Sequence, residues 1–134
     1  GRSSARNTQH REKVTISAVG NCDAVTRLGQ FEVLIEYDNT DKYLRCDLTD
    51  TTVNRCILQG LIDGVATLRG PHDVKLVAAT ALGLSGVPKF NGPNADLRRT
   101  LISALQERDC KFAFQAVDGQ GEELRKHIRM GNSK

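Results

Sequence analysis

Cysteine side chains are the first candidates for metal or redox chemistry, and their spacing favours neither. No two cysteines form a C-x-x-C pair, the spacing typical of many zinc sites and redox motifs. The four are Cys22, Cys46, Cys56 and Cys110. We therefore expect reduced, mostly buried thiols, with no bound metal and no cofactor.

Basic side chains toward the C-terminus form a second group of candidate functional residues. Two segments that we expect to be helices carry the candidates Arg98, Arg99, Arg125, Lys126 and Arg129. Cationic side chains gathered on one face bind polyanions such as nucleic acid. These residues are therefore candidates for a nucleic-acid-binding face, and the alternative is a set of solvated surface charges.

The start of an expected helix supplies the third candidate site. Thr51 and Thr52 carry hydroxyls that can cap a helix, and Asn54 follows in its first turn. Free N–H groups and the helix dipole favour an anion there, so the helix start that Thr52 marks is a candidate phosphate site. Plain helix capping is the alternative, and the residue types favour it.

Hydrophobic periodicity predicts the elements that position these residues. Alternating segments rich in β-branched residues predict strands over residues 13–19, 30–37 and 42–49, with a turn at 38–41. Strands joined so closely form an antiparallel meander. The order of these first elements is therefore three strands, followed by the helix that Thr52 begins.

The second half of the chain alternates between helices and strands. Apolar residues at helical spacing predict a helix that ends at Gly70-Pro71, and the nearly all-apolar run at 74–80 predicts a buried parallel strand. A Gly- and Pro-rich loop at 83–94 follows, with room for one helical turn before it. The remaining elements are a helix over 95–109 capped by Asn94, a strand over 110–117 and a helix over 122–130.

Length and composition fit one folded domain. Of 134 residues, 39% are hydrophobic and only 4% aromatic, so we expect a single aliphatic core within residues 13–130. Residues 1–12 are expected to form a flexible basic tail and residues 131–134 a second tail. The net charge of +3 permits a polyanionic partner without requiring one.

Apolar runs in the chain are all short. None approaches the roughly 18 residues that span a bilayer, and none is typical of a signal peptide. We therefore expect an intracellular protein, cytoplasmic or nuclear or organellar, with no membrane partner. We also expect no small-molecule substrate.

Several motifs and the order of elements resemble ribonuclease HI. Gly20 and Cys22 match two residues of the family's T-D-G-S-C, and Tyr37 matches the tyrosine that ends its second strand. Residues 51–55 (TTVNR) resemble the T-T-N-N-R that opens its first long helix, and residues 94–97 match N-A-D-L. The resemblance implies an α/β, ribonuclease H-like fold: a five-stranded mixed sheet, three antiparallel strands then two parallel ones, flanked by helices.

The resemblance also identifies a missing metal site. The family's nucleases hold two Mg²⁺ ions with four carboxylates. Three of these positions fall on Val19, Ile57 and Ala79, and the fourth has one candidate remnant, Glu122. One carboxylate cannot hold two divalent ions, so we expect no metal and no cleavage of RNA, and an apolar cluster that has closed as core.

Only some of the residues that contact nucleic acid in the family have a match in this chain. Thr52 and Asn54 match positions that contact a hybrid duplex in the family. Asp50 stands where the family has an arginine and would repel phosphate, and Val25 and Val53 replace asparagines. The substrate-binding surface is therefore weakened as well.

Two classes of function remain, together with one distant third. We favour a catalytically inactive domain that acts as a protein-interaction or scaffold module in a nucleic-acid-related complex. The alternative is a non-catalytic domain that binds an RNA/DNA hybrid or duplex RNA. The third is an active metal-dependent ribonuclease H.

Overall fold

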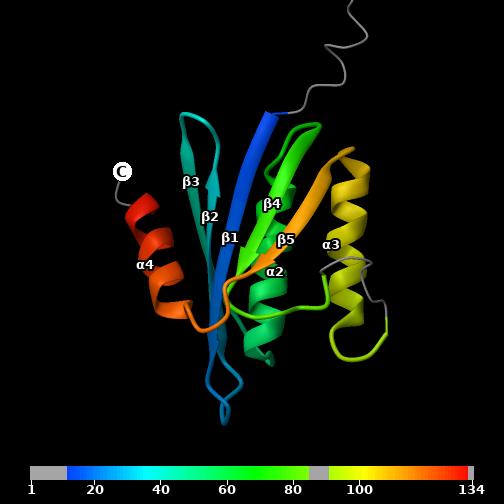
Figure 1. The fold of residues 1–134 in the computed structure, drawn as a ribbon. Helices are drawn as coiled ribbons and strands as arrows, with labels where there is room; N and C mark the ends of the chain where they lie inside the picture. The colour runs from blue at the N-terminus through cyan, green and yellow to red at the C-terminus, as the bar shows by residue number, and fades with distance from the viewer. Residues whose placement is uncertain (1–11, 85–90, 133–134) are drawn as a thin grey trace, which may run out of the picture.

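The computed structural model describes residues 12–84 and 91–132 and shows one five-stranded sheet with helices on both faces (Figure 1). The strands are β1 (Glu12–Cys22), β2 (Gly29–Glu36), β3 (Asp41–Leu48), β4 (His72–Ala78) and β5 (Lys111–Ala116). The helices are α2 (Val53–Ala66), α3 (Ala95–Glu107) and α4 (Gly121–Asn132). None of these helices is long and apolar enough to cross a membrane.

The sheet has the strand order β3-β2-β1-β4-β5. The pairs β1–β2 and β2–β3 are antiparallel, and β1–β4 and β4–β5 are parallel. The expected α/β class and the mixed sheet of three antiparallel and two parallel strands are therefore confirmed. Strand β1 lies at the centre, and the helices reach it from either side.

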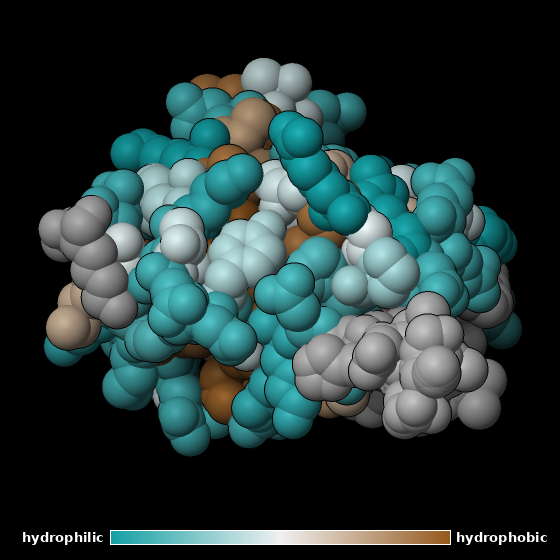
Figure 2. All heavy atoms as spheres, turned by 90° about the horizontal axis from the view of Figure 1, so that it is seen from above, coloured by the Kyte–Doolittle hydropathy of each residue, from teal (hydrophilic) through white to brown (hydrophobic). Residues whose placement is uncertain are grey.

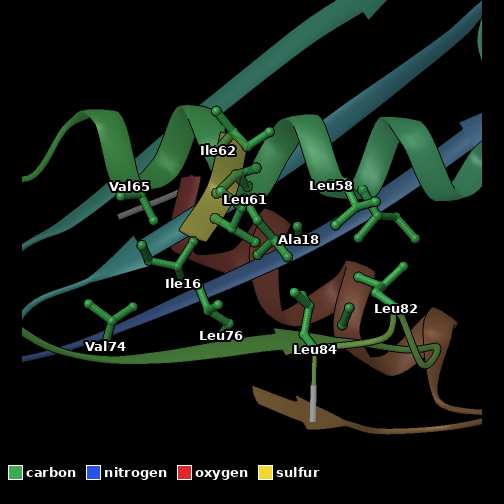
Figure 3. Close-up of a cluster of buried hydrophobic side chains, with 14 of the residues drawn as sticks. Ile16, Ala18, Leu58, Leu61, Ile62, Val65, Val74, Leu76, Leu82 and Leu84 are labelled. Carbon is green, nitrogen blue, oxygen red and sulfur yellow. The ribbon is translucent and has the colours of Figure 1, made fainter. Parts of the chain in front are cut away.

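One face of the sheet is covered by α2 and α3 over a mainly aliphatic core that also buries Phe31. Strand β1 turns Ile16 and Ala18 toward Leu58 and Leu61 of α2 (Figure 3). The helix lies unusually close, because a Cβ at Gly64 would come within 2.8 Å of Ile16 Cγ2. Burial on this face supplies most of the driving force for folding, since fully burying one such side chain contributes about 1.5–3 kcal/mol.

The other face carries only α4 and a smaller apolar cluster. Val19, Leu34 and Val77 of the sheet pack against Leu124 and Ile128 of the helix. Figure 1 shows α4 beside β1, β2 and β3, on the opposite side of the sheet from α2 and α3. The β4–β5 half of this face has no helix over it among the described residues.

A bidentate ion pair joins helix α3 to helix α2. The Arg55 guanidinium donates to both carboxylate oxygens of Asp96, at 3.1 and 3.0 Å. It also donates to Asn94 Oδ1 at 3.3 Å. The prediction that the Asn94 side chain caps α3 is therefore wrong: Asn94 lies in the left-handed region with φ 65° and makes no side-chain cap bond, because its amide oxygen accepts from Arg55 instead.

The ends of the folded region differ from those predicted by one or two residues. Glu12 already pairs with His72 in the sheet, and α4 continues through Gly131 and Asn132, because Gly131 is buried against Leu34. Residues 81–84 contain no helical turn. Most of the predicted N-terminal tail (1–11), part of the predicted loop (85–90) and residues 133–134 lie outside the described residues.

Candidate functional site

The three apolar positions singled out in the sequence surround one hollow. Val19, Ile57 and Ala79 all line it, and its volume is about 210 Å³. Its remaining lining residues are Ala18, Gly20, Val53, Thr80, Gly121 and Arg125. Residues that are 38 and 22 positions apart in the sequence (57 − 19 and 79 − 57) are thus brought together.

The topology explains why these positions meet. Parallel strands β1 and β4 end at the same edge of the sheet, which places Val19 near the end of one and Ala79 just after the other. Helix α2 begins at this edge with Val53, and Ile57 faces the sheet one turn later. Helix α4 begins there too, at Gly121.

The expectation that this cluster has closed as core is only partly met. Val19 and Ile57 are buried, with 4% and 5% of their surface exposed. Ala79, Gly20 and Gly121 add little or no side-chain volume, and for this reason the apolar residues line an open hollow instead of filling it. Val53 remains 42% exposed at its margin.

The chemistry of the hollow does not fit divalent cations. None of the described residues that line it is acidic, and Glu122 is exposed and is not among them. Arg125 is one of the lining residues and brings a positive charge to the hollow, and the positive ends of α2 and α4 both lie there. Mg²⁺ requires oxygen ligands and is repelled by such groups. No group of three or more His, Cys, Asp or Glu side chains suited to a metal occurs within the described residues.

A buried carboxylate beside the hollow was not anticipated from the sequence. Glu32 is only 2% exposed, although it pairs with Val19 in the sheet and lies beneath α4. Arg129 donates to both of its oxygens, Nη2 to Oε1 at 2.7 Å and Nε to Oε2 at 2.9 Å. Arg125 lies farther away, with Nη1 3.9 Å from Oε1.

Electrostatics within this cluster keep the carboxylate charged. The hydrogen bonds from Arg129 lower the pKa of Glu32, more than burial raises it. Burial, and then the charge of Glu32, raise the pKa of Tyr43 on the neighbouring strand. The signal in the sequence was the alternation of residues 31–36 (FEVLIE), which places Glu32, Leu34 and Glu36 on one face of β2, opposite the arginines of α4.

The five predicted basic residues do not form one face. Arg98 and Arg99 belong to α3, whereas Arg125, Lys126 and Arg129 belong to α4 on the other side of the sheet. The prediction of a joint polyanion-binding face is therefore wrong, because the sheet lies between the two helices.

The surroundings of these basic side chains also differ from one to another. Arg98 is buried, with 7% exposure, and donates to the carbonyls of Pro93 and Asn91 at 2.9 and 2.6 Å. Arg129 holds Glu32. Arg99 and Lys126 are exposed on the surfaces of α3 and α4.

The start of α2 is a capped helix end. The Thr52 hydroxyl oxygen accepts from the backbone N–H of Arg55 at 3.3 Å, as an N-cap does. Asn54 is exposed in the first turn. Asp50 is 92% exposed and lies 3.6 Å from the Arg27 guanidinium. Capping therefore accounts for Thr52, and a nearby negative charge opposes a phosphate.

The cysteines are free thiols, but the expectation that most are buried is wrong. Cys56 alone of the four is buried, and burial raises the pKa of its thiol. Cys46 is exposed, since it lies on edge strand β3, where residues 45–47 are all exposed. Cys22 donates to the carbonyl of Thr51 at 3.2 Å, which ties the β1–β2 hairpin to the start of α2.

Comparison with known proteins assigns no family. No protein-family model matches the chain, and no curated protein is significantly similar to it. The function must therefore be inferred from the hollow, the charges around it and the surfaces of the described residues.

Proposed function

We propose that this chain is a non-catalytic domain of ribonuclease H-like architecture that binds another protein within a nucleic-acid-related complex. The observation that carries the proposal is the hollow lined by Val19, Ile57 and Ala79. These residues occupy the positions where the resemblance implies metal-binding carboxylates. Their convergence on one edge of the sheet supports the resemblance.

Loss of catalysis follows from the chemistry of that lining. Two-metal hydrolysis needs clustered carboxylates to hold the ions that activate water and stabilise the leaving group. Aliphatic side chains supply no ligand, and the guanidinium of Arg125 disfavours cations. Glu122, the candidate remnant, is exposed in the first turn of α4 and does not line the hollow, and none of the described lining residues is acidic.

Exposed apolar side chains support a protein partner. Val25 and Leu28 on the β1–β2 hairpin are 90% and 55% exposed, and Val53 is 42% exposed. Figure 1 shows this hairpin projecting from the end of the sheet where α2 and α4 begin. Figure 2 shows the opposite end, where hydrophilic side chains dominate. Of the four exposed large apolar side chains among the described residues, all but Met130 thus lie at this end, and such a group favours contact with protein.

Binding of nucleic acid is the alternative, and one feature of the sheet favours it. Lys13, Lys75 and Lys111 line a groove of about 620 Å³ over β1, β4 and β5, in the half of the sheet that α4 leaves open. Asp73 lies between Lys13 and Lys111 in the strand register and offsets part of their charge. Phe112 and Phe114 are among the residues that line the groove, but they also pack against the core, which disfavours stacking of their rings on bases.

An assay with nucleic acids tests the proposal. An RNA/DNA hybrid, duplex RNA and single strands are incubated with the protein in Mg²⁺ or Mn²⁺, and cleavage and binding are followed across a salt series. We expect no cleavage above the protein-free background and no binding stronger than non-specific contact. Micromolar binding that weakens steeply with salt would favour the alternative. Metal-dependent cleavage that is lost in Glu122→Gln would overturn the proposal.

A further inference from the structure

We infer that the hollow binds the C-terminal residue of a partner polypeptide, with an aliphatic side chain against Val19, Ile57 and Ala79 and the carboxylate toward Arg125. The inference rests on the proposed function and names the site and the chemistry of the partner. Two properties of the hollow lead to it: its size and the sign of its charge.

Size excludes larger ligands. At about 210 Å³, the hollow is smaller than the roughly 300–1,000 Å³ of pockets that take drug-sized molecules or cofactors. One branched aliphatic side chain with its carboxylate is a ligand of suitable size. Its apolar part would cover Val19, Ile57 and Ala79, of which Ala79 remains only partly buried.

The charge around the hollow favours an anion. Arg125 and Arg129 share one buried carboxylate, Glu32, and Arg129 occupies both of its oxygens. Arg125, with 22% of its side chain exposed, approaches Glu32 only to 3.9 Å and makes no hydrogen bond to another described residue. Its donors are thus available to a carboxylate, and such charge-assisted bonds are among the strongest in proteins.

Backbone donors at the start of α4 add to this preference. Leu124 N–H is bonded to Gln120 O at 2.9 Å, one turn back. The N–H groups of the preceding residues, from Gly121 onward, lie in the first turn, where a helix offers no acceptor of its own. Gly121 lines the hollow and adds no side chain between these donors and a ligand.

A second hollow favours a peptide over a free acid. It has a volume of about 240 Å³, lies along the hairpin side of α2, and shares Val53 with the first. Cys22, Ala24 and Thr51 also line it. A chain that ends in the first hollow can therefore continue over Val53 into the second, which a single small acid cannot do.

The test compares short peptides by fluorescence anisotropy. A Gly/Ser-rich peptide that ends in leucine is labelled at its N-terminus and prepared with a free carboxylate and with a C-terminal amide, and free isocaproate serves as the small acid. We expect the carboxylate peptide to bind at least about tenfold more tightly than the amide, because the amide loses a charged hydrogen bond. Isocaproate should compete only weakly.

Substitutions test whether the peptide binds in the hollow. Arg125→Gln and Ala79→Leu, which remove the cation and fill the hollow, should each weaken binding of the carboxylate peptide at least about tenfold. The matched control is Lys126→Gln, which removes a neighbouring exposed charge and should leave binding unchanged. Circular dichroism and thermal unfolding confirm that each variant is folded, and Arg125→Lys should restore part of the affinity.

Each remaining outcome decides against the inference. The inference would be overturned if the carboxylate and amide peptides bound with equal affinity, or if Ala79→Leu bound the carboxylate peptide as tightly as the unchanged protein. It would also be overturned if no peptide bound at millimolar concentration, or if isocaproate bound as tightly as the peptide. Such a result would leave the proposed function intact, since another surface could hold the partner. Metal-dependent cleavage of RNA, in contrast, would overturn the function itself.

Discussion

The two faces of the central sheet are built by different means. On the α2 face, aliphatic side chains and close glycine contacts form a continuous core. On the α4 face, five buried apolar residues are joined by a buried carboxylate and two arginines. The first arrangement leaves no room between helix and sheet, whereas the second leaves the hollow where α4 begins.

The two faces therefore differ in role: the α2 face stabilises the fold, and the α4 face forms one wall of the hollow. Ile57 is fixed by the α2 core, so the wall of the hollow on that side is rigid. The opposite wall, at Gly121 and Arg125, belongs to a helix held partly by polar contacts. Substitutions on the α2 face should therefore unfold the domain, while those on the α4 face should alter mainly the docking of one helix.

The largest expected effect compares Leu61→Ala with Ile128→Ala, both of which have no exposed surface. We expect Leu61→Ala to lower the free energy of unfolding by about 3–5 kcal/mol, because its neighbours cannot close the cavity. For Ile128→Ala we expect about 2–3 kcal/mol, since α4 can shift toward the sheet. Urea denaturation measures both. A larger loss for Ile128→Ala would contradict the difference between the faces.

A smaller effect compares two glycines at helix–sheet contacts. An added Cβ at Gly64 would meet Ile16, and one at Gly131 would meet Leu34. We expect Gly64→Ala to cost about 1–3 kcal/mol through overpacking in the middle of α2. Gly131→Ala should cost less, although its contact is closer, because it lies in the last turn of α4. Thermal unfolding would refute this if the order were reversed.

The smallest effect depends on pH. The folded-state pKa of Glu32 lies below the ordinary value of 4.5, so folding favours its charged form. Its contribution is fully present above that value and is lost as pH falls through the lowered pKa. Glu32→Gln should cost about 1–2 kcal/mol at neutral pH and make stability less dependent on pH below 4.5. Glu36→Gln is the control, and an equal change in both variants would argue against a special role for Glu32.

Local patterns in the sequence predicted most of the fold. All five strands were predicted, the first three from alternation and β4 from a nearly all-apolar run, and Thr52 correctly marked the start of α2. The close packing of helices on the sheet could not be predicted from local patterns, because Gly64 and Gly131 lie against Ile16 and Leu34, which are far away in the sequence. Asn94 is a residue type that often caps helices, but its side-chain oxygen accepts a hydrogen bond from Arg55, which is 39 residues away in the sequence.

The candidate site was predicted in part. Val19, Ile57 and Ala79 were found by resemblance, and their positions at one edge follow from the parallel pairing of β1 and β4. The arginines could not be placed from charge alone, because helical charge patterns do not say on which face of a sheet a helix lies. Glu32 was missed for the same reason, since its burial depends on α4.

The central claim is that the hollow cannot hold the metals of a two-metal nuclease. Titration of ¹⁵N-labelled protein with Mg²⁺, followed by NMR, tests it directly, with Ca²⁺ as a comparison and Arg125→Gln as a second sample. We predict no saturable shifts at the amides of Val19, Ile57, Ala79 and Gly121. Saturable shifts confined to those amides at millimolar Mg²⁺, and abolished by Glu122→Gln, would contradict the account.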